Sequence, residues 1–171
     1  MEAMMAQFLV LAVFPALLLL AAAWDLASFT IPNAISLALV STFLVLAFLV
    51  GMPAAMLGWH ALAGVGGLLL GFLLFALRFI GGGDAKLFAS VALLFGLHDA
   101  LAYALIASLL GGGLTLGLLA MRRWPLPQFL AKPWLLRLHD EREGVPYGVA
   151  LAAGAFVLLP HTEIFRLAAG G

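Results

Sequence analysis

The 171-residue chain is 65% hydrophobic and only 9% charged, its net charge is zero, and it contains no cysteine. A soluble domain needs a polar shell, with about a quarter of its residues charged, so this composition excludes one. The lack of cysteine excludes disulfides, thiolate metal sites and a cysteine nucleophile. No basic patch interleaved with aromatic residues indicates a nucleic-acid partner.

Apolar stretches of about 18 residues or more recur along the chain, and this length crosses the hydrocarbon core of a lipid bilayer. We therefore predict an all-α polytopic membrane protein with a single domain over residues 1–171. The first stretch ends in three alanines, as a signal peptide does, but no Lys or Arg precedes Arg78, so we expect it to remain as a membrane helix. Six transmembrane helices are expected, at about residues 6–24, 34–50, 62–80, 85–97, 100–121 and 145–159.

The breaks between these helices carry the polar residues. Pro32 disfavours helix at the residue before it, and Asn33 is expected to cap the second helix. Asp84 is expected to cap the fourth helix, and His98-Asp99 to turn the chain before the fifth. The charged stretch 122–144 is predicted to be a cytosolic or interfacial loop, because it mixes aromatic and basic residues.

The positive charges predict how the chain is oriented. If the six helices alternate in direction, seven of the eight Lys and Arg residues share one side of the membrane: Arg78, Lys86, Arg122, Arg123, Lys132, Arg137 and Arg142. Short loops rich in Lys and Arg remain in the cytoplasm. Both termini are then expected outside, and Asp25 and Asp84 at the cytoplasmic edge of the membrane.

Asp25 and Asp84 are the two acidic residues that stand between apolar helices on that side. A carboxylate near hydrocarbon costs several kcal/mol unless it is paired or protonated, so two at one depth indicate a shared site. One carboxylate would act as a base toward water and the other as an acid toward a carbonyl oxygen. Helix dipoles favour ionised Asp84 and protonated Asp25, which is a hypothesis.

Each feature also has a simpler interpretation. Glycine and aspartate are ordinary turn residues, so Gly81-Gly82-Gly83-Asp84 would also suit a plain turn and helix cap. Three consecutive glycines would otherwise let the backbone bend and an extended substrate approach. An interfacial ion pair with Arg78 or Lys86 would explain Asp25.

Three segments resemble the signatures of type IV prepilin peptidases. They are Asp25 followed by Ile31-Pro32-Asn33, then 81–87 (GGGDAKL), then 145–150 (VPYGVA). The middle segment is the GxGD motif, which presenilin-type proteases also use. The resemblance implies a GxGD aspartyl protease-like fold with Asp25 and Asp84 as its catalytic residues. Residues expected to shape the substrate site are Gly81, Gly82, Gly83, Lys86, Pro32, Asn33 and Tyr147, the last with a packing role as an equal alternative.

The resemblance further implies removal of the N-terminal leader from prepilins and pseudopilins at the cytoplasmic face of the bacterial inner membrane, without a metal or organic cofactor. Larger members carry a tetracysteine zinc loop and also N-methylate the new terminus. This chain has neither the cysteines nor room for that loop. It therefore resembles the compact branch that serves tight-adherence (Flp) pili, and methyltransferase activity is not expected. The sequence predicts no oligomeric state.

Two other classes of function stay open at this stage. Carboxylates at broken helices also mark proton and cation routes, so a small membrane transporter or ion-pathway protein is one alternative. A structural subunit of a pilus assembly machine is the other. Leader cleavage that depends on Asp25 and Asp84 would distinguish a peptidase from both.

Overall fold

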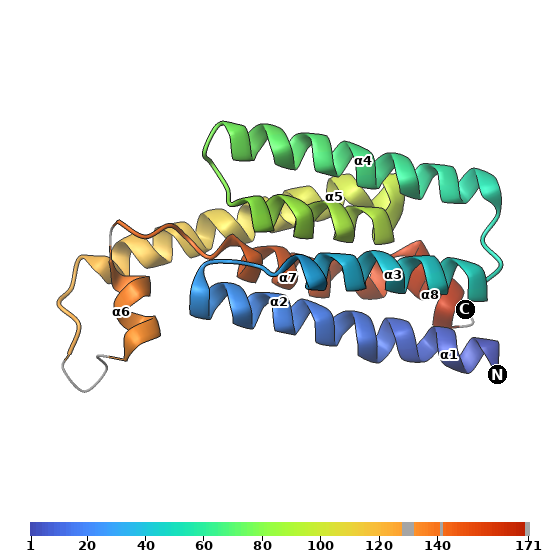
Figure 1. Cartoon of the computed structure of the whole chain (residues 1–171), viewed down its shortest axis with the longest axis horizontal. Coiled ribbons are helices and arrows are strands. Elements are labelled where there is room, and N and C mark those ends of the chain that lie inside the picture. The colour runs from blue at the N-terminus through green and yellow to red at the C-terminus, as the bar shows by residue number, and fades with distance from the viewer. Residues whose placement is uncertain (128–131, 141, 170–171) are drawn as a thin grey trace.

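The computed structural model describes residues 1–127, 132–140 and 142–169, and its regular elements within these ranges are all helices (Figure 1). In chain order they are α1 (Glu2–Phe8), the π-helix η1 (Leu9–Val13), α2 (Phe14–Ser28), α3 (Asn33–Leu49), α4 (Ala54–Ala76), α5 (Gly82–Arg122), α6 (Pro133–His139), α7 (Tyr147–Leu158), the 3₁₀ helix η3 (Leu159–His161) and α8 (Glu163–Ala169).

The helices have the length and surface of a membrane protein. Three continuous stretches are long and apolar enough to cross a bilayer, namely Glu2–Ser28, Ala54–Ala76 and Gly82–Arg122, and two further apolar helices are shorter. Large apolar side chains such as Phe72 and Leu109 are more than half exposed on the outside of the bundle. Such a surface suits lipid and not water, so the expected class of all-α membrane protein is confirmed.

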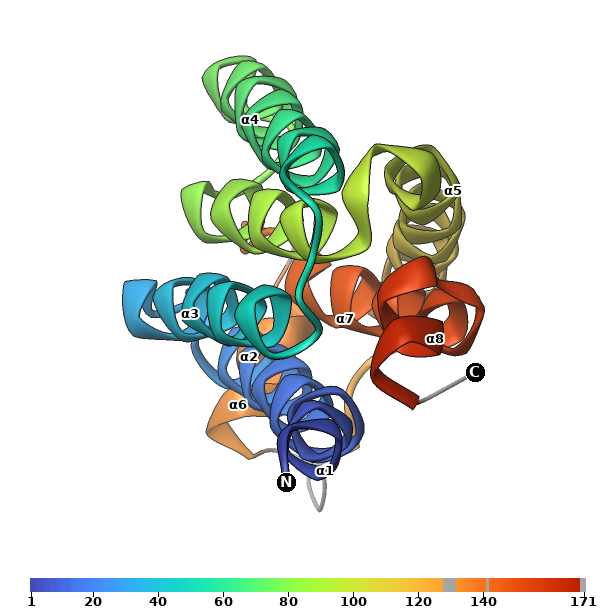
Figure 2. The same cartoon turned by 90° about the vertical axis from the view of Figure 1, so that its right-hand side faces the viewer.

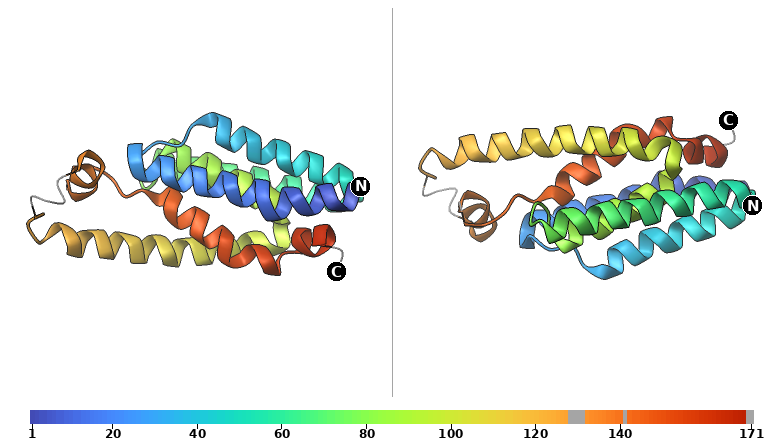
Figure 3. Two further views of the ribbon diagram at one scale, coloured as in Figure 1. Left: turned by 90° about the horizontal axis from the view of Figure 1, so that it is seen from below. Right: turned by 90° about the horizontal axis from the view of Figure 1, so that it is seen from above.

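Helix α5 is broken at Gly96, whose backbone is non-helical (φ 77°, ψ 171°). The chain reverses there, and the second half of α5 (residues 97–122) runs back beside α7 (Figures 2 and 3). The turn predicted at His98-Asp99 is wrong, because both residues lie in the second half of the helix. Glycine has no Cβ and adopts a positive φ at little cost, so the break falls at Gly96.

Other helix boundaries also differ from the expected ones. Helix α2 continues to Ser28 instead of ending near residue 24, so Asp25 lies within it. Helix α3 begins at Asn33 itself, with Pro32 at the N-cap position and no side-chain cap. Helix α5 begins at Gly82, so Asp84 is its third residue and not its cap.

The segment 122–144 is not a plain loop, because it contains α6, and a further helix, α8, follows α7. The expected loop residues 128–131 and 141 lie outside the described part of the chain. Arg122 ties the segment together: its Nε donates to the Leu138 carbonyl oxygen and its Nη2 to that of Gly144, both at 2.9 Å. The segment therefore returns to the end of the bundle where α7 begins.

The bundle has two distinct ends. The connections 29–32 and 77–81 and the start of α7 lie at one end, while the N-terminus and α8 lie at the other (Figure 1). The core between them is formed by fully buried apolar side chains, among them Phe14, Leu18, Leu39, Leu87 and Leu94. Asp25 on α2 and Asp84 on α5 thus lie at the same end of the bundle, and both helices pack against α7.

Candidate active site

Asp25 lies in the last turn of α2 and is only 3% exposed. Its Oδ2 accepts a 2.7 Å hydrogen bond from the backbone N–H of Gly148, which lies in the first turn of α7. The first N–H groups of a helix have no partner within the helix and carry its positive dipole end. One oxygen of Asp25 is therefore fixed by a group that suits a carboxylate.

Asp84, the third residue of α5, is 6% exposed. Its Oδ2 accepts a 3.0 Å hydrogen bond from the backbone N–H of Gly81, which caps the helix. Its Oδ1 is buried and has no hydrogen-bond partner among the described residues. A buried carboxylate oxygen without a partner is unusual in a folded protein, and such a group often marks a site of chemistry.

The structure brings the two carboxylates together in one cavity of about 290 Å³, which is also lined by Phe29, Thr30, Ile31, Gly81, Gly82, Gly83 and Lys86. Asp25 and Asp84 are close enough for their charges to repel each other. Each of them accepts a backbone N–H, that of Gly148 for Asp25 and that of Gly81 for Asp84. The cavity is therefore lined by two segments that are distant in the sequence, and Gly148 of a third segment holds Asp25.

The simpler interpretation of Asp25 as half of an ion pair is not what the structure shows. Within the described residues, neither Arg78 nor Lys86 forms a salt bridge with Asp25 or Asp84. Lys86 Nζ instead donates a 2.7 Å hydrogen bond to Asn33 Oδ1. This contact joins the first turn of α3 to the first turns of α5 and holds the connection after Asp25 beside Asp84.

The three glycines do not bend the backbone as expected, because none of them has a positive φ. Gly81 is the N-cap of α5, and Gly82 and Gly83 form its first turn. Gly83 serves a close approach instead, since a Cβ there would lie 3.0 Å from the backbone N and the Cβ of Ile31. Small size at this position lets the connection before α3 pack against the start of α5.

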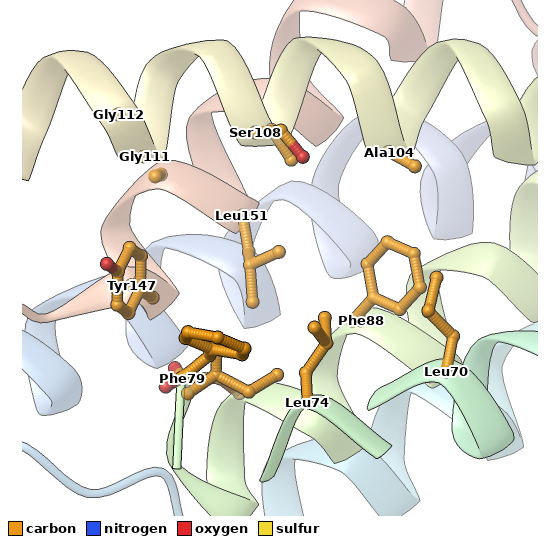
Figure 4. A pocket seen from close by; sticks show the side chains of 14 residues that line it. Leu70, Leu74, Phe79, Phe88, Ala104, Ser108, Gly111, Gly112, Tyr147 and Leu151 are labelled. Atoms are coloured by element: carbon orange, nitrogen blue, oxygen red, sulfur yellow. The ribbon is translucent and has the colours of Figure 1, made fainter. Parts of the chain in front are cut away.

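A second cavity of about 370 Å³ begins at Asp84 and extends between α4, both halves of α5 and α7 (Figure 4). We call it the apolar groove, and its lining residues are Leu70, Leu74, Phe79, Ile80, Asp84, Phe88, Ala104, Ala107, Ser108, Gly111, Gly112, Tyr147, Ala150 and Leu151. Asp84 lines both cavities. Asp84 therefore stands where a cavity of mixed polar and apolar lining meets an apolar one.

Tyr147 lines the apolar groove, but its contacts are those of a packed side chain. A Cβ on Gly111 would lie 3.3 Å from its ring, and its hydroxyl lies 3.3 Å from Thr115 Oγ1. These contacts join the start of α7 to the second half of α5. They favour the packing role over direct contact with the carboxylates.

The sequence analysis missed the Gly148 N–H as part of this site. Gly148 also allows a close approach, because a Cβ there would lie 2.8 Å from Asp25 Oδ2 and from Ile31 Cδ1. The available signal was Pro146, which stands just before the helix and leaves the next N–H groups free for a partner. Nothing in the sequence identified Asp25 as that partner.

The fold and the site together define a helical membrane protein with two buried carboxylates in one cavity. The family model described as the type IV leader peptidase family matches residues 12–116, well over half of the chain and including both aspartates. The chain belongs to this family, so the resemblance seen in the motifs is confirmed. No curated protein and no solved structure matches the chain.

Proposed function

We propose that this protein is an aspartic endopeptidase that removes the leader from type IV prepilins and pseudopilins, with Asp25 and Asp84 as its catalytic residues. The observation that carries the proposal is the shared cavity in which both carboxylates are buried, neither of them in an ion pair with a described residue. Each has one oxygen held by a backbone N–H, from Gly148 and Gly81. Membership of the leader peptidase family supports the same activity.

The chemistry needs one carboxylate ionised and the other protonated. The ionised carboxylate takes a proton from a water molecule, whose oxygen attacks the carbonyl carbon of the scissile peptide bond. The protonated carboxyl gives its proton to the carbonyl oxygen. When the tetrahedral intermediate collapses, the C–N bond breaks and the leaving amine takes the proton from the first carboxyl group. The second carboxylate takes a proton back from a hydroxyl of the intermediate, so the new carboxyl end forms and both aspartates return to their starting states. The unpartnered Asp84 Oδ1 is a suitable acceptor for the attacking water.

The dipole argument assigned the base role to Asp84 and the acid role to Asp25. The part that concerns Asp84 is supported, because Asp84 lies in the first turn of α5, at the positive end of that helix. Asp25, however, lies at the negative end of its own helix α2 and also at the positive end of α7, where its carboxylate accepts the Gly148 N–H. The two dipoles therefore act on Asp25 in opposite directions. We retain the assignment as a proposal, to be tested by the pH–rate profile of the wild-type protein and of any residual activity that purified Asp25→Asn and Asp84→Asn keep.

The two cavities that meet at Asp84 fit a substrate with two parts. A polar leader suits the cavity lined by backbone glycines, Thr30 and Lys86, which opens at the end of the bundle. An apolar segment of the precursor suits the apolar groove. The scissile bond would then lie between the two parts, next to Asp25 and Asp84.

We further propose that six segments cross the bilayer, including each half of α5, and that the carboxylates face the cytosol of a bacterium at its inner membrane. The support is the distribution of positive charge described above and the location of the 29–32 and 77–81 connections at one end of the bundle (Figure 1). The substrate is proposed to be a Flp-type pilin, because the short connection between α2 and α3 has no zinc loop and the chain has no cysteine.

Cleavage of a candidate prepilin in a bacterium that lacks its own leader peptidase tests the proposal. Co-expressed wild-type protein should shorten the precursor, as seen by gel shift and by intact mass. Asp25→Asn and Asp84→Asn should each leave the precursor intact while the protein accumulates normally. Asp99→Asn is a matched control, because Asp99 is also a mostly buried acid but accepts the Glu163 N–H beside α8.

The outcomes separate the competing classes. Loss of cleavage in both site variants and retention in Asp99→Asn supports the peptidase. If wild-type protein leaves the precursor intact in this host, a structural subunit of a pilus machine is supported. Cleavage that both Asp25→Asn and Asp84→Asn retain would instead contradict the catalytic role of the two aspartates. If purified protein cleaves nothing but mediates ion flux in liposomes, the transporter alternative holds.

A further inference from the structure

His60 is a buried histidine at the opposite end of the bundle from the carboxylates. It lies in the second turn of α4, is 2% exposed, and stacks on the ring of Phe43 with centroids 5.1 Å apart. Its Nδ1 lies 2.8 Å from the backbone carbonyl oxygen of Leu93. A carbonyl only accepts, so the Nδ1 of His60 carries the proton and donates it.

This hydrogen bond falls at the break in α5. In a continuous helix the Leu93 carbonyl would accept the N–H of Leu97, but the non-helical backbone of Gly96 interrupts that pattern. The last carbonyls before a helix end need other partners. The imidazole supplies one, and it also fills the space beside Gly96, where a Cβ would lie 3.0 Å from both Cε1 and Nε2 of the ring.

The break decides how the two halves of α5 lie relative to each other, and each half carries part of the site. The first half bears Asp84, 12 positions before Gly96, or roughly 18 Å along the helix. The second half packs closely against α7, where a Cβ on Gly154 would lie 3.1 Å from the backbone of Ala107. Helix α7 in turn presents Gly148 to Asp25.

We infer that His60 is a positioning residue that fixes the angle at Gly96 and thereby the placement of Asp84 relative to the Asp25–Gly148 pair. Its effect on cleavage rests on the proposed function, but the effect on geometry does not. The donor must be at the Nδ1 position, since that nitrogen reaches Leu93. Asparagine places its amide nitrogen the same number of bonds from the backbone, whereas glutamine places it one bond further.

The geometric test uses spin labels, for which the cysteine-free chain is convenient. Labels at Leu69→Cys on α4 and Leu109→Cys on the second half of α5, both more than half exposed, report the angle through their distance distribution. His60→Asn should retain the wild-type distribution, and His60→Gln and His60→Phe should shift or broaden it. His98→Asn is the control, because the His98 side chain is 84% exposed near the same break.

Leader cleavage is measured on the same variants without labels. We expect His60→Asn to cleave at nearly the wild-type rate, and His60→Gln and His60→Phe to lose about 10- to 100-fold, since a misplacement near 1 Å has that effect. The inference is overturned if the glutamine and phenylalanine variants match the wild type in distance and rate, or if asparagine fails as they do. If wild-type protein cleaves no prepilin, the proposed function fails, while the label distances still decide the role of His60.

Discussion

The backbone N–H of Gly148 donates a 2.7 Å hydrogen bond to Oδ2 of Asp25 across 123 positions of sequence. This contact attaches the start of α7 to the last turn of α2 and fixes one carboxylate oxygen in the cavity that also holds Asp84. It requires a residue without a side chain, because a Cβ on Gly148 would lie 2.8 Å from that oxygen. The geometry of the carboxylate pair therefore depends on Gly148.

We expect Gly148→Ala to reduce leader cleavage by about 10- to 100-fold, because the new methyl group must displace both the Asp25 carboxylate and Ile31. The rate should be measured on purified protein with a fixed precursor concentration. Gly117→Ala is the matched control, since a Cβ there has nothing within 4 Å. Equal rates for the two alanine variants would show that the carboxylate does not need its present position.

Asn33 and Lys86 form a second contact around the cavity, with Lys86 Nζ 2.7 Å from Asn33 Oδ1. Both side chains are at the surface, so we expect the bond to contribute less than about 1 kcal/mol to folding. The bond also holds the connection that carries Ile31. Asn33→Ala and Lys86→Met should therefore each lower the cleavage rate about two- to fivefold. The double variant should lose little more than either single one.

The measurement compares the melting temperatures and cleavage rates of Asn33→Ala, Lys86→Met and the double variant. Arg123→Met is the control for loss of a positive charge, because Arg123 is exposed and lies beyond the end of α5. Fully additive losses in the double variant would show that the two side chains act independently.

Cleavage should be insensitive to chelators and to thiol reagents. Among the described residues that line the cavity, the acidic side chains are Asp25 and Asp84, and no histidine accompanies them. No group of three metal-binding side chains occurs in the described ranges, and the sequence contains no cysteine to modify. Activity is measured in detergent with and without EDTA. A loss that added zinc or magnesium restores would contradict the two-carboxylate mechanism.

The sequence was sufficient to predict that Asp25 and Asp84 lie at the same end of the molecule. The apolar stretches predict approximately how many times the chain crosses the membrane. Because successive crossings alternate in direction, they also determine which breaks lie at the same end of the bundle. The class of fold and the family followed from the same features. The catalytic role of the two aspartates stays a prediction.

Positions that depend on distant contacts were not predictable. Gly96 stands in an apolar stretch with many other glycines, and only its packing against His60 distinguishes it. Asn33 has the side chain of a good N-cap, but Lys86, 53 positions away, takes its oxygen instead. Likewise Asp84 matches the pattern of an N-cap, yet helix α5 begins three residues earlier than expected, at Gly82, and Asp84 accepts the N–H of the N-cap residue Gly81.

The apolar groove offers a test that leaves the carboxylates untouched. Gly112 and Gly113 are neighbours in the second half of α5, and a Cβ on either has nothing within 4 Å. Gly112 lines the groove, whereas Gly113 does not (Figure 4). Substituting leucine at either position changes helix propensity equally, by about 1 kcal/mol in favour of the helix, so the two variants differ mainly in what the side chain obstructs.

We expect Gly112→Leu to raise the KM for a full-length precursor by about tenfold or more, because a leucine in the groove competes with the apolar segment of the substrate for space. Its kcat should change less, since Asp25 and Asp84 stay in place. Gly113→Leu should match the wild type in both constants. A soluble peptide that contains the leader and cleavage site but no apolar segment should be cleaved equally by all three proteins. If Gly112→Leu leaves the KM of the full-length precursor unchanged, the apolar segment binds elsewhere on the protein.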